Sequence, residues 1–235
     1  MKPTRVTRRV FLTTALGGVG VAACPLPLRA QPRTVKIGVV TPVTGAMAEV
    51  GQDCRLGAQL AAEAVNAAGG IKSMGGAKLE LLLGDSQTRV EVARAEAERL
   101  INSGAQLLTG AFHSAHVATI APLAQQRRVP YLIDITAADA PTANIARSVR
   151  EGLQKVQYVY RNFPGSATFG RNAVRYMTEI FREAGVSPKR VVAMYTNDLF
   201  GKTQIESFMN AHKAAAPGFA PKREYSAATF TTKRK

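Results

Sequence analysis

Short apolar runs alternate with longer, periodic segments along most of the chain. The runs are rich in valine, isoleucine and leucine, whereas apolar residues in the longer segments recur every three or four positions. Runs of the first kind predict buried strands, and segments of the second kind predict amphipathic helices. Strands that alternate with helices in this way are typical of an α/β fold with a parallel sheet.

The first part of the chain is expected to form one lobe, residues 31–150. Glycines follow its periodic segments, as Gly69-Gly70 and Gly104 do, because glycine tolerates the left-handed conformation that ends many helices. The expected strands are residues 35–40, 78–83, 106–109 and 130–135, and the expected helices are residues 52–67, 90–103 and 115–126.

A second lobe is expected over residues 151–235, joined to the first by a connection near residues 141–164. Its expected elements are a helix at 172–184, a strand at 190–195 and a last strand at 223–231. Roughly seventy residues are few for a doubly wound domain, because small domains bury too little surface. We therefore expect two Rossmann-like lobes with parallel sheets, the second incomplete, in a chain truncated or interrupted after Lys235.

The N-terminus has the features of a twin-arginine export signal. Arg8-Arg9 stands directly before an apolar run, residues 11–23, that ends in small residues. This order is typical of a signal peptide, and the run is shorter than the roughly 20 residues that a membrane-spanning helix needs. We expect residues 1–30 to be a signal peptide and the mature protein to be periplasmic.

Two processing sites remain open in this signal. Cleavage after Ala30 would release a soluble protein, and Pro25 and Pro27 are typical of the region before such a site. Val21-Ala22-Ala23-Cys24 instead resembles a lipoprotein site, which would leave a lipid on Cys24 as an anchor. The soluble product is preferred, and lipidation at Cys24 is the alternative.

Charge and cysteine content exclude some classes of protein. The formal net charge is +15, of which +10 belongs to residues 31–235, and the basic residues are scattered over several expected helices. A nucleic-acid-binding protein would concentrate them on one element, so no nucleic-acid partner is expected.

Cys24 is lost or lipidated in either scheme of signal processing, which leaves Cys54 without a disulfide partner. Cys54 is most simply a half-buried thiol.

No common catalytic or nucleotide-binding motif is complete. The first expected strand runs into Thr41-Pro42 and lacks the G-x-G-x-x-G turn that a dinucleotide needs. Gly201-Lys202-Thr203 copies the end of a P-loop, but Thr196 stands where the first glycine belongs. Because no G-x-S-x-G serine elbow is present either, we expect neither an enzyme nor a bound cofactor.

Titratable residues near expected strand ends offer weak signals for metal or proton chemistry. His113 and His116 share a helix face but have no neighbouring cysteine or carboxylate, so no metal site is expected. Asp85, Asp134 and Asp139 end or follow expected strands. We expect these carboxylates to contact a ligand or to cap a helix rather than to act as a catalytic base.

Five segments resemble the leucine/isoleucine/valine-binding proteins of ABC importers, in the order that this family has. They are residues 37–45, 66–71, 110–114, 129–139 and 197–201, and the resemblance extends from about residue 35 to 231. It implies a type I periplasmic-binding-protein fold, in which two lobes close on a small amino acid or related solute. It also implies a permease in the inner membrane as partner.

The ends of the expected strands are where an open parallel sheet binds its ligand. Ser114 stands there at the start of a helix, where its hydroxyl and the free amides behind it favour a ligand carboxylate; a plain helix cap is the alternative. By the resemblance, the backbone of Thr136 and Ala138 would hold the ligand's ammonium and carboxylate. Ala137 and Ala138 would let the ligand approach the main chain, with ordinary packing as the alternative. Phe200 would cover the ligand from the second lobe, or else be a core residue at a helix start.

Several positions depart from the family pattern. Val50 stands where leucine-type binders commonly carry tyrosine, which changes one wall of the pocket. His113 and Asp139 add titratable groups that suit an amide, a urea-like compound or an aromatic carboxylic acid, although both could simply face solvent. The later family segments that supply the acidic partner of the ligand ammonium do not occur before Lys235. The alternatives to a solute-binding protein are a non-functional fragment of one, or an α/β enzyme whose site escapes recognition.

Overall fold

The computed structural model describes residues 33–215 and 220–225. The expected signal peptide, Cys24 and the last residues of the expected strand at 223–231 lie outside this part. Among the helices that are described, none combines the length and the apolar composition that a membrane span requires.

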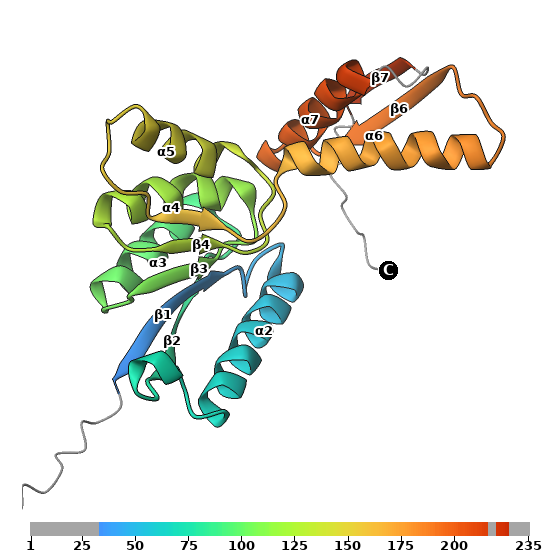
Figure 1. Cartoon of the computed structure of the whole chain (residues 1–235). Helices are drawn as coiled ribbons and strands as arrows, with labels where there is room; N and C mark the ends of the chain where they lie inside the picture. Colours follow the sequence, from blue (N-terminus) through green and yellow to red (C-terminus); the bar gives the residue numbers. More distant parts are fainter. Residues whose placement is uncertain (1–32, 216–219, 226–235) are drawn as a thin grey trace, which may run out of the picture. The chain divides into compact units, whose positions relative to one another are not determined.

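Five of the described strands form one parallel sheet in the order β2-β1-β3-β4-β5 (Figure 1). Chain order reverses beside β1, because β2 pairs with one of its edges and β3 with the other. At such a reversal, the loops that follow the strands diverge and leave a crevice at the carboxyl ends. The strands are β1 (Thr34–Thr41), β2 (Lys78–Asp85), β3 (Leu107–Gly110), β4 (Tyr131–Ile133) and β5 (Val159–Arg161).

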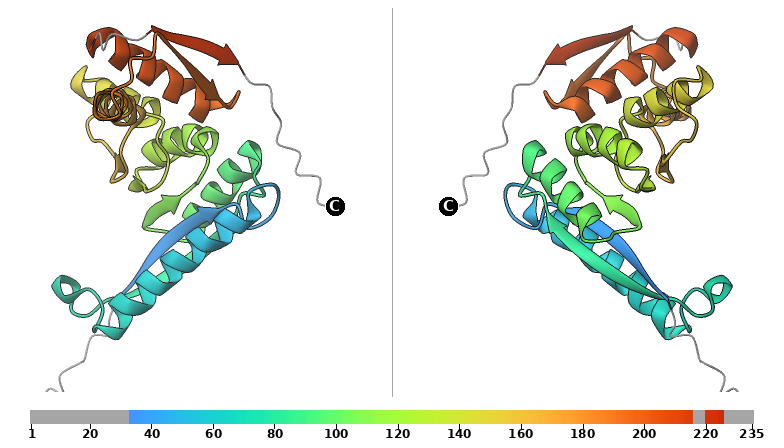
Figure 2. Two further views of the ribbon diagram at one scale, coloured as in Figure 1. Left: turned by 90° about the vertical axis from the view of Figure 1, so that its right-hand side faces the viewer. Right: turned by 90° about the vertical axis from the view of Figure 1, so that its left-hand side faces the viewer.

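Helices cover both faces of this sheet. Helix α2 (Ala48–Ala67) packs on one face, whereas α3 (Val90–Asn102) and α4 (Ser114–Arg127) pack on the other (Figures 1 and 2). A short 3₁₀ helix, η1 (Lys72–Met74), precedes β2. The buried core lies on the α3–α4 side and includes Ala97, Leu100, Leu108, Ile120, Leu123, Tyr131, Ile133 and Val159. The α/β fold with a parallel sheet that the alternating pattern predicts is confirmed.

Two elements lie inside the segment 141–164, which we expected to be a connection. Helix α5 (Ala140–Arg150) has Pro141 in its first turn and buries little besides Ile145, so its apolar stripe is too thin to recognise in the sequence. Strand β5 is only three residues long, and it pairs with β4 in parallel. The first sheet therefore extends to Arg161, beyond residue 150, where the end of the first lobe was expected.

The second sheet, in the described residues, consists of β6 (Arg190–Tyr195) and β7 (Ala220–Tyr225) in parallel. Helices α6 (Ser166–Glu183) and α7 (Leu199–Ala215) pack closely against each other. A Cβ atom on Gly170 would lie 2.5 Å from the backbone carbonyl of Ser207, so only glycine allows this approach. Strand β6 has the predicted bounds, whereas α7 was not predicted from the sequence.

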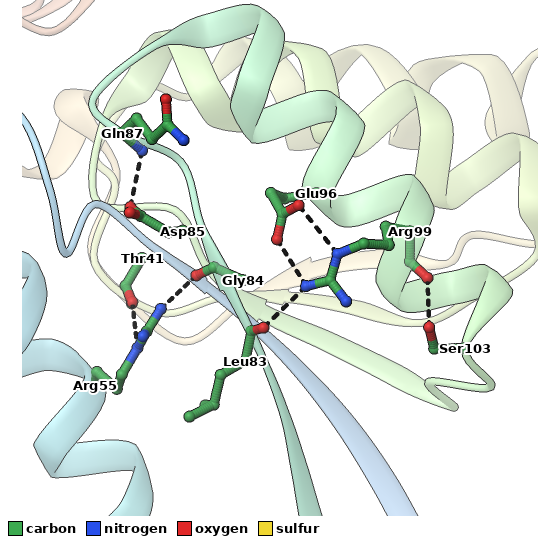
Figure 3. A network of polar contacts seen from close by, with 9 residues as sticks. All are labelled: Thr41, Arg55, Leu83, Gly84, Asp85, Gln87, Glu96, Arg99 and Ser103. Carbon is green, nitrogen blue, oxygen red and sulfur yellow. Dashed lines mark hydrogen bonds and ion pairs between the residues drawn. The ribbon is translucent and has the colours of Figure 1, made fainter.

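A polar network holds the loops at the carboxyl end of β2 (Figure 3). Asp85 accepts hydrogen bonds from the backbone amides of Val43 (3.0 Å) and Gln87 (2.9 Å) and from the hydroxyl of Thr44 (2.6 Å). Burial alone would raise the pKa of Asp85, but these hydrogen bonds outweigh it and lower the pKa. Asp85 thereby fixes the turn between β1 and α2.

Two arginines hold the same end of the strand from either face of the sheet (Figure 3). Arg55 on α2 donates to the hydroxyl of Thr41 (3.2 Å) and to the carbonyl of Gly84 (2.5 Å). Arg99 on α3 donates to the carbonyl of Leu83 (3.0 Å) and pairs with Glu96 at 2.7 Å. The end of β2 is thus anchored to both helix layers.

We predict that Asp85→Asn lowers the free energy of unfolding by about 1–3 kcal/mol, because an amide cannot accept all the hydrogen bonds that the carboxylate accepts. Urea denaturation at pH 7 measures this loss. Glu80→Gln on the same strand is the control. Glu80 is exposed and faces Lys36 at 3.9 Å, so its replacement is expected to change stability by less than about 0.5 kcal/mol. Equal losses in the two variants would contradict the role of Asp85.

Candidate functional site

A cavity of about 540 Å³ lies where loops after the strands converge. Residues that follow β3, β4, β5 and β6 all contribute to its wall, as do the start of α7 and the turn before α2. Strands β3, β4 and β5 bring their carboxyl ends to one edge of the first sheet, which explains why the segments that follow them meet here. The segment after β6 and the start of α7 come from the second sheet and its helices. The wall consists of Met47, Phe112, His113, Ser114, Ile135, Thr136, Ala137, Phe163, Phe169, Thr196, Asp198, Phe200 and Gln204.

A tight turn after β3 presents one side of the wall. Gly110 (φ 93°) and Ala111 (φ 65°) are both in the left-handed region. A Cβ on Gly110 would lie 2.3 Å from the carbonyl oxygen of Val40, so glycine is required at this position. The turn places Phe112 in the cavity wall and makes His113 the N-cap residue of α4.

Ser114 has the most informative side chain in the wall. The residue is only 2% exposed, and its Oγ atom has no hydrogen-bond partner among the described residues. Because His113 occupies the N-cap position, the plain-cap alternative for Ser114 does not hold. A buried hydroxyl without a partner costs about 1–3 kcal/mol, and this one lies at a helix N-terminus, which favours anions. Ser114, the residue expected to donate its hydroxyl to a ligand carboxylate, lies in the cavity wall.

The loop after β4 brings Thr136 and Ala137 to the cavity, as expected. The hydroxyl of Thr136 donates to the carbonyl of Ala111 at 2.7 Å, which ties this loop to the turn after β3. Arg161, at the end of β5, donates to the carbonyls of Thr136 (3.0 Å) and Ala138. Burial lowers the pKa of Arg161, and the charge of Asp139 offsets part of that effect. The carbonyl expected to meet a ligand ammonium thus already accepts a hydrogen bond from a cation.

Ala138 and Asp139 do not line the cavity. Ala138 is fully buried, and the carboxylate of Asp139 accepts a hydrogen bond from the amide of Ala167 at 2.9 Å. A Cβ on Gly165 would lie 1.7 Å from Asp139 Oδ1, so the carboxylate sits tightly against the start of α6. Asp139 has the helix-capping contact that was its alternative role. Ser166 strengthens the junction by donating its hydroxyl to the carbonyl of Ala137 at 3.0 Å.

Aromatic side chains make up much of the remaining wall. Phe200, on α7 and 45% exposed, lies at the cavity as expected. Phe112, Phe163 and Phe169 lie there as well, although the sequence patterns did not indicate them. Phe112 lies three residues after the end of the predicted strand 106–109, which was a usable signal, whereas Phe163 follows β5, a strand that was not predicted. Val50 lies on α2, is 38% exposed and is not part of the wall.

His113 lies in the cavity wall, whereas His116 is buried in α4. His113 Nε2 is 3.9 Å from Asp198 Oδ2, across the cavity wall. The rings of His113 and His116 are 5.5 Å apart. Within residues 33–215, no three His, Cys, Asp or Glu side chains gather closely enough to hold a metal ion. Burial, aided by the charge of His113, lowers the pKa of His116 to about 4, so the His116 ring is neutral at pH 7.

Comparison with known proteins places this architecture in a family. The model of the periplasmic binding protein family matches residues 34–231. The chain belongs to this family. It is 30% identical over 187 residues to a Leu/Ile/Val-binding protein homolog 8 of Brucella suis, a match that covers 78% of this chain and 43% of the relative. The family resemblance expected from the five segments is therefore confirmed.

Solved structures support the same fold. A leucine-binding protein of Thermotoga maritima matches with a TM-score of 0.66 and 23% identity, over 83% of this chain and 50% of that protein. A branched-chain amino acid binding protein of Streptococcus pneumoniae, solved with isoleucine, matches with a TM-score of 0.65 and 23% identity, over 85% of this chain and 52% of that protein. The type I periplasmic-binding-protein fold is confirmed. The chain spans less than half the length of the Brucella relative.

We predict that Arg161→Met lowers the free energy of unfolding by about 2–4 kcal/mol, because the carbonyls of Thr136 and Ala138 lose their charged donor. Chemical denaturation measures the loss. Arg150→Met removes an exposed arginine at the end of α5 and is expected to cost less than about 1 kcal/mol. A loss no larger than that of the control would show that Arg161 does not hold the loop.

His116 is expected to make the protein less stable in mild acid. Its pKa is about 4 in the folded protein and near 6.5 when unfolded, so the unfolded chain binds more protons between these values. Its contribution is complete above pH 6.5 and is lost as the pH falls to 4, by about 3 kcal/mol. Urea denaturation at pH 7 and pH 4.5 is expected to show a smaller change for His116→Gln than for the unaltered chain. Identical pH dependences would contradict this prediction.

Proposed function

We propose that this chain is part of an extracytoplasmic solute-binding protein of an ABC importer. In this proposal, the cavity at the strand ends binds a small carboxylate, either an amino acid or a related compound, without bond chemistry. Closing of the two lobes around the solute is the working step, and a permease in the inner membrane is the partner. The names of the relatives support this class of function, since they describe branched-chain amino acid binding.

The observation that carries the proposal is the hydroxyl of Ser114, which has no hydrogen-bond partner within residues 33–215 and 220–225. It is buried at the N-terminus of α4 and belongs to the cavity wall. A ligand carboxylate there would satisfy the hydroxyl and would meet the positive end of the helix dipole. We assign to Ser114 the carboxylate of the solute, to Thr136 and Ala137 the close approach of the main chain, and to Phe200 the cover over the solute. His113 lies at the rim, where it can contact a polar substituent.

The location outside the cytoplasm also belongs to this proposal. Residues 1–30 as a twin-arginine signal peptide and a lipid on Cys24 stay predictions. Two lobes that close on each other also stay a prediction, with the first sheet reaching Arg161 instead of ending before the expected boundary at residue 150. Mass spectrometry of the protein recovered from the periplasm and membranes of the producing cell would distinguish a chain that begins at Gln31 from a lipidated chain that begins at Cys24.

We predict that a small carboxylate raises the melting temperature of the full chain, because a ligand that binds only the folded state stabilises it. A thermal unfolding screen with the common amino acids and simple carboxylates at millimolar concentration tests this, followed by calorimetry on each compound that stabilises. If none of them shifts the transition, the proposed function fails.

Ser114→Ala is expected to weaken binding of such a carboxylate about tenfold or more, since a hydrogen bond to a charged group is lost. Ser103→Ala is the matched control. Ser103 lies exposed at the end of α3 and donates to the carbonyl of Arg99 (2.9 Å), so its removal is expected to leave affinity unchanged. Equal affinities of both variants would remove Ser114 from the site.

A further inference from the structure

The first sheet ends on one side in the long strand β2. Among the described strands, β2 is the outermost on this side, and its strand partner is β1. Within eight residues it carries Leu79, Leu81, Leu82 and Leu83, with Glu80 among them. The edge of such an apolar strand is a template on which another chain can add a strand. It needs protection if copies of the protein are to stay apart.

Alternate residues of β2 turn their backbone groups toward this edge. The amide of Lys78 donates to the carbonyl of Arg33 at 3.1 Å, on the side of β1. Successive residues in a strand point their backbone groups in opposite directions. Those of Leu79, Leu81 and Leu83 therefore point away from β1. These three residues supply the donors and acceptors that a further strand would use.

The side chain of Asn66 already occupies the first of these positions. Its Nδ2 donates to the carbonyl of Leu79 at 2.9 Å, and its Oδ1 accepts from the amide of Leu79 at 2.7 Å. One primary amide thus makes both of the hydrogen bonds that a neighbouring strand would make to this residue. Asn66 acts here as a one-residue substitute for a strand.

The turn after α2 fixes Asn66 at this place. Asn66 lies in the last turn of the helix, and its backbone carbonyl accepts from Lys78 Nζ. The chain returns to β2 through Gly70, whose φ is 80° and where a Cβ would lie 2.4 Å from the carbonyl oxygen of Ala77. The segment 66–71, which does not line the cavity, thus has a role at the edge of the sheet.

Arg99 covers the other end of the edge from the opposite face of the sheet. It donates to the carbonyl of Leu83 at 3.0 Å (Figure 3), and Glu96 pairs with its guanidinium at 2.7 Å. Asn66 comes from α2 and Arg99 from α3, so the two side chains reach the edge around both faces. Leu81 lies between the two covered positions.

We propose that Asn66 and Arg99 are edge guards, which keep a second copy of this chain from pairing with β2. The partner that fits the unguarded edge is β2 of another copy, antiparallel across a two-fold axis. This inference goes beyond the proposed function and does not depend on it, because no residue of β2 lines the cavity.

One register suits such a pair of strands. With Leu81 opposite its own counterpart, Leu79 lies opposite Leu83 of the other copy, and about six backbone hydrogen bonds can form. Glu80 then lies opposite Leu82, so its charge meets no like charge. In this register Asn66 and Arg99 cover the two residues that face each other, which is why removing either side chain favours pairing.

Asn66→Ala in the full chain tests the guard. Without the side-chain amide, the backbone groups of Leu79 are free to pair with a second copy. Self-association is expected to be at least about tenfold tighter than in the unaltered chain. Sedimentation equilibrium over a range of protein concentrations measures it, and far-ultraviolet circular dichroism shows whether the variant is folded.

Asn102→Ala is the matched control. Asn102 is exposed at the end of α3, so this variant is expected to sediment like the unaltered chain. A folded Asn66→Ala that also sediments like the unaltered chain would overturn the proposal, whatever its loss of stability.

Hydrogen exchange locates the association at the edge. In associated Asn66→Ala, the amides of Leu79, Leu81 and Leu83 are expected to exchange at least about tenfold more slowly than in the same variant diluted to monomer. Association without protection of these amides would show that another surface is responsible, and the proposal would fail.

Arg99→Met decides the question if Asn66→Ala does not fold. This variant uncovers the carbonyl of Leu83 at the other end of the edge. It is expected to self-associate about threefold more tightly than the unaltered chain, with the same slow amide exchange. A folded Arg99→Met with unaltered sedimentation would then overturn the proposal, while the proposed function would stand.

Discussion

Parallel pairing of the strands is the constraint on which the candidate site depends. Because β1, β3, β4 and β5 run in the same direction, every loop that follows one of them leaves from the same edge of the sheet. Residues from Phe112 to Phe163 meet there although they are far apart in the sequence. The reversal of strand order beside β1 opens the crevice that these loops surround.

Hydrogen bonds join the loop after β4, at the carboxyl edge of the first sheet, to helix α6. Arg161 and Ser166 donate to the loop's carbonyls, and Asp139 accepts from the first turn of α6. Each of these contacts uses a polar group that would be expensive to bury alone. The same contacts place α6, with Phe169, next to the loop that presents Thr136 and Ala137. Stability and site geometry are therefore coupled through the same few residues.

The polar and apolar groups of the cavity have complementary roles. Most of the wall is apolar and aromatic, whereas Ser114 supplies a hydroxyl that has no partner among the described residues. Arg161, which is partly buried, is engaged with backbone carbonyls and does not line the cavity. Selectivity in such a site comes from the placement of a few polar groups in a largely apolar wall, rather than from net charge.

Local sequence patterns determined the alternation of strands and helices, because apolar periodicity and glycine stops are local signals. The same patterns determined that four residues stand at strand or helix ends: Ser114, Thr136, Ala137 and Phe200. They could not determine α5 and β5, because a thin apolar stripe and a three-residue strand carry almost no pattern. Only the tertiary structure decided that Asp139 caps α6 and that Arg161 holds the loop, since both depend on partners about twenty or more residues away. The aromatic wall was likewise decided by tertiary structure, because Phe112 and Phe163 follow strands of the first sheet whereas Phe169 and Phe200 lie on α6 and α7.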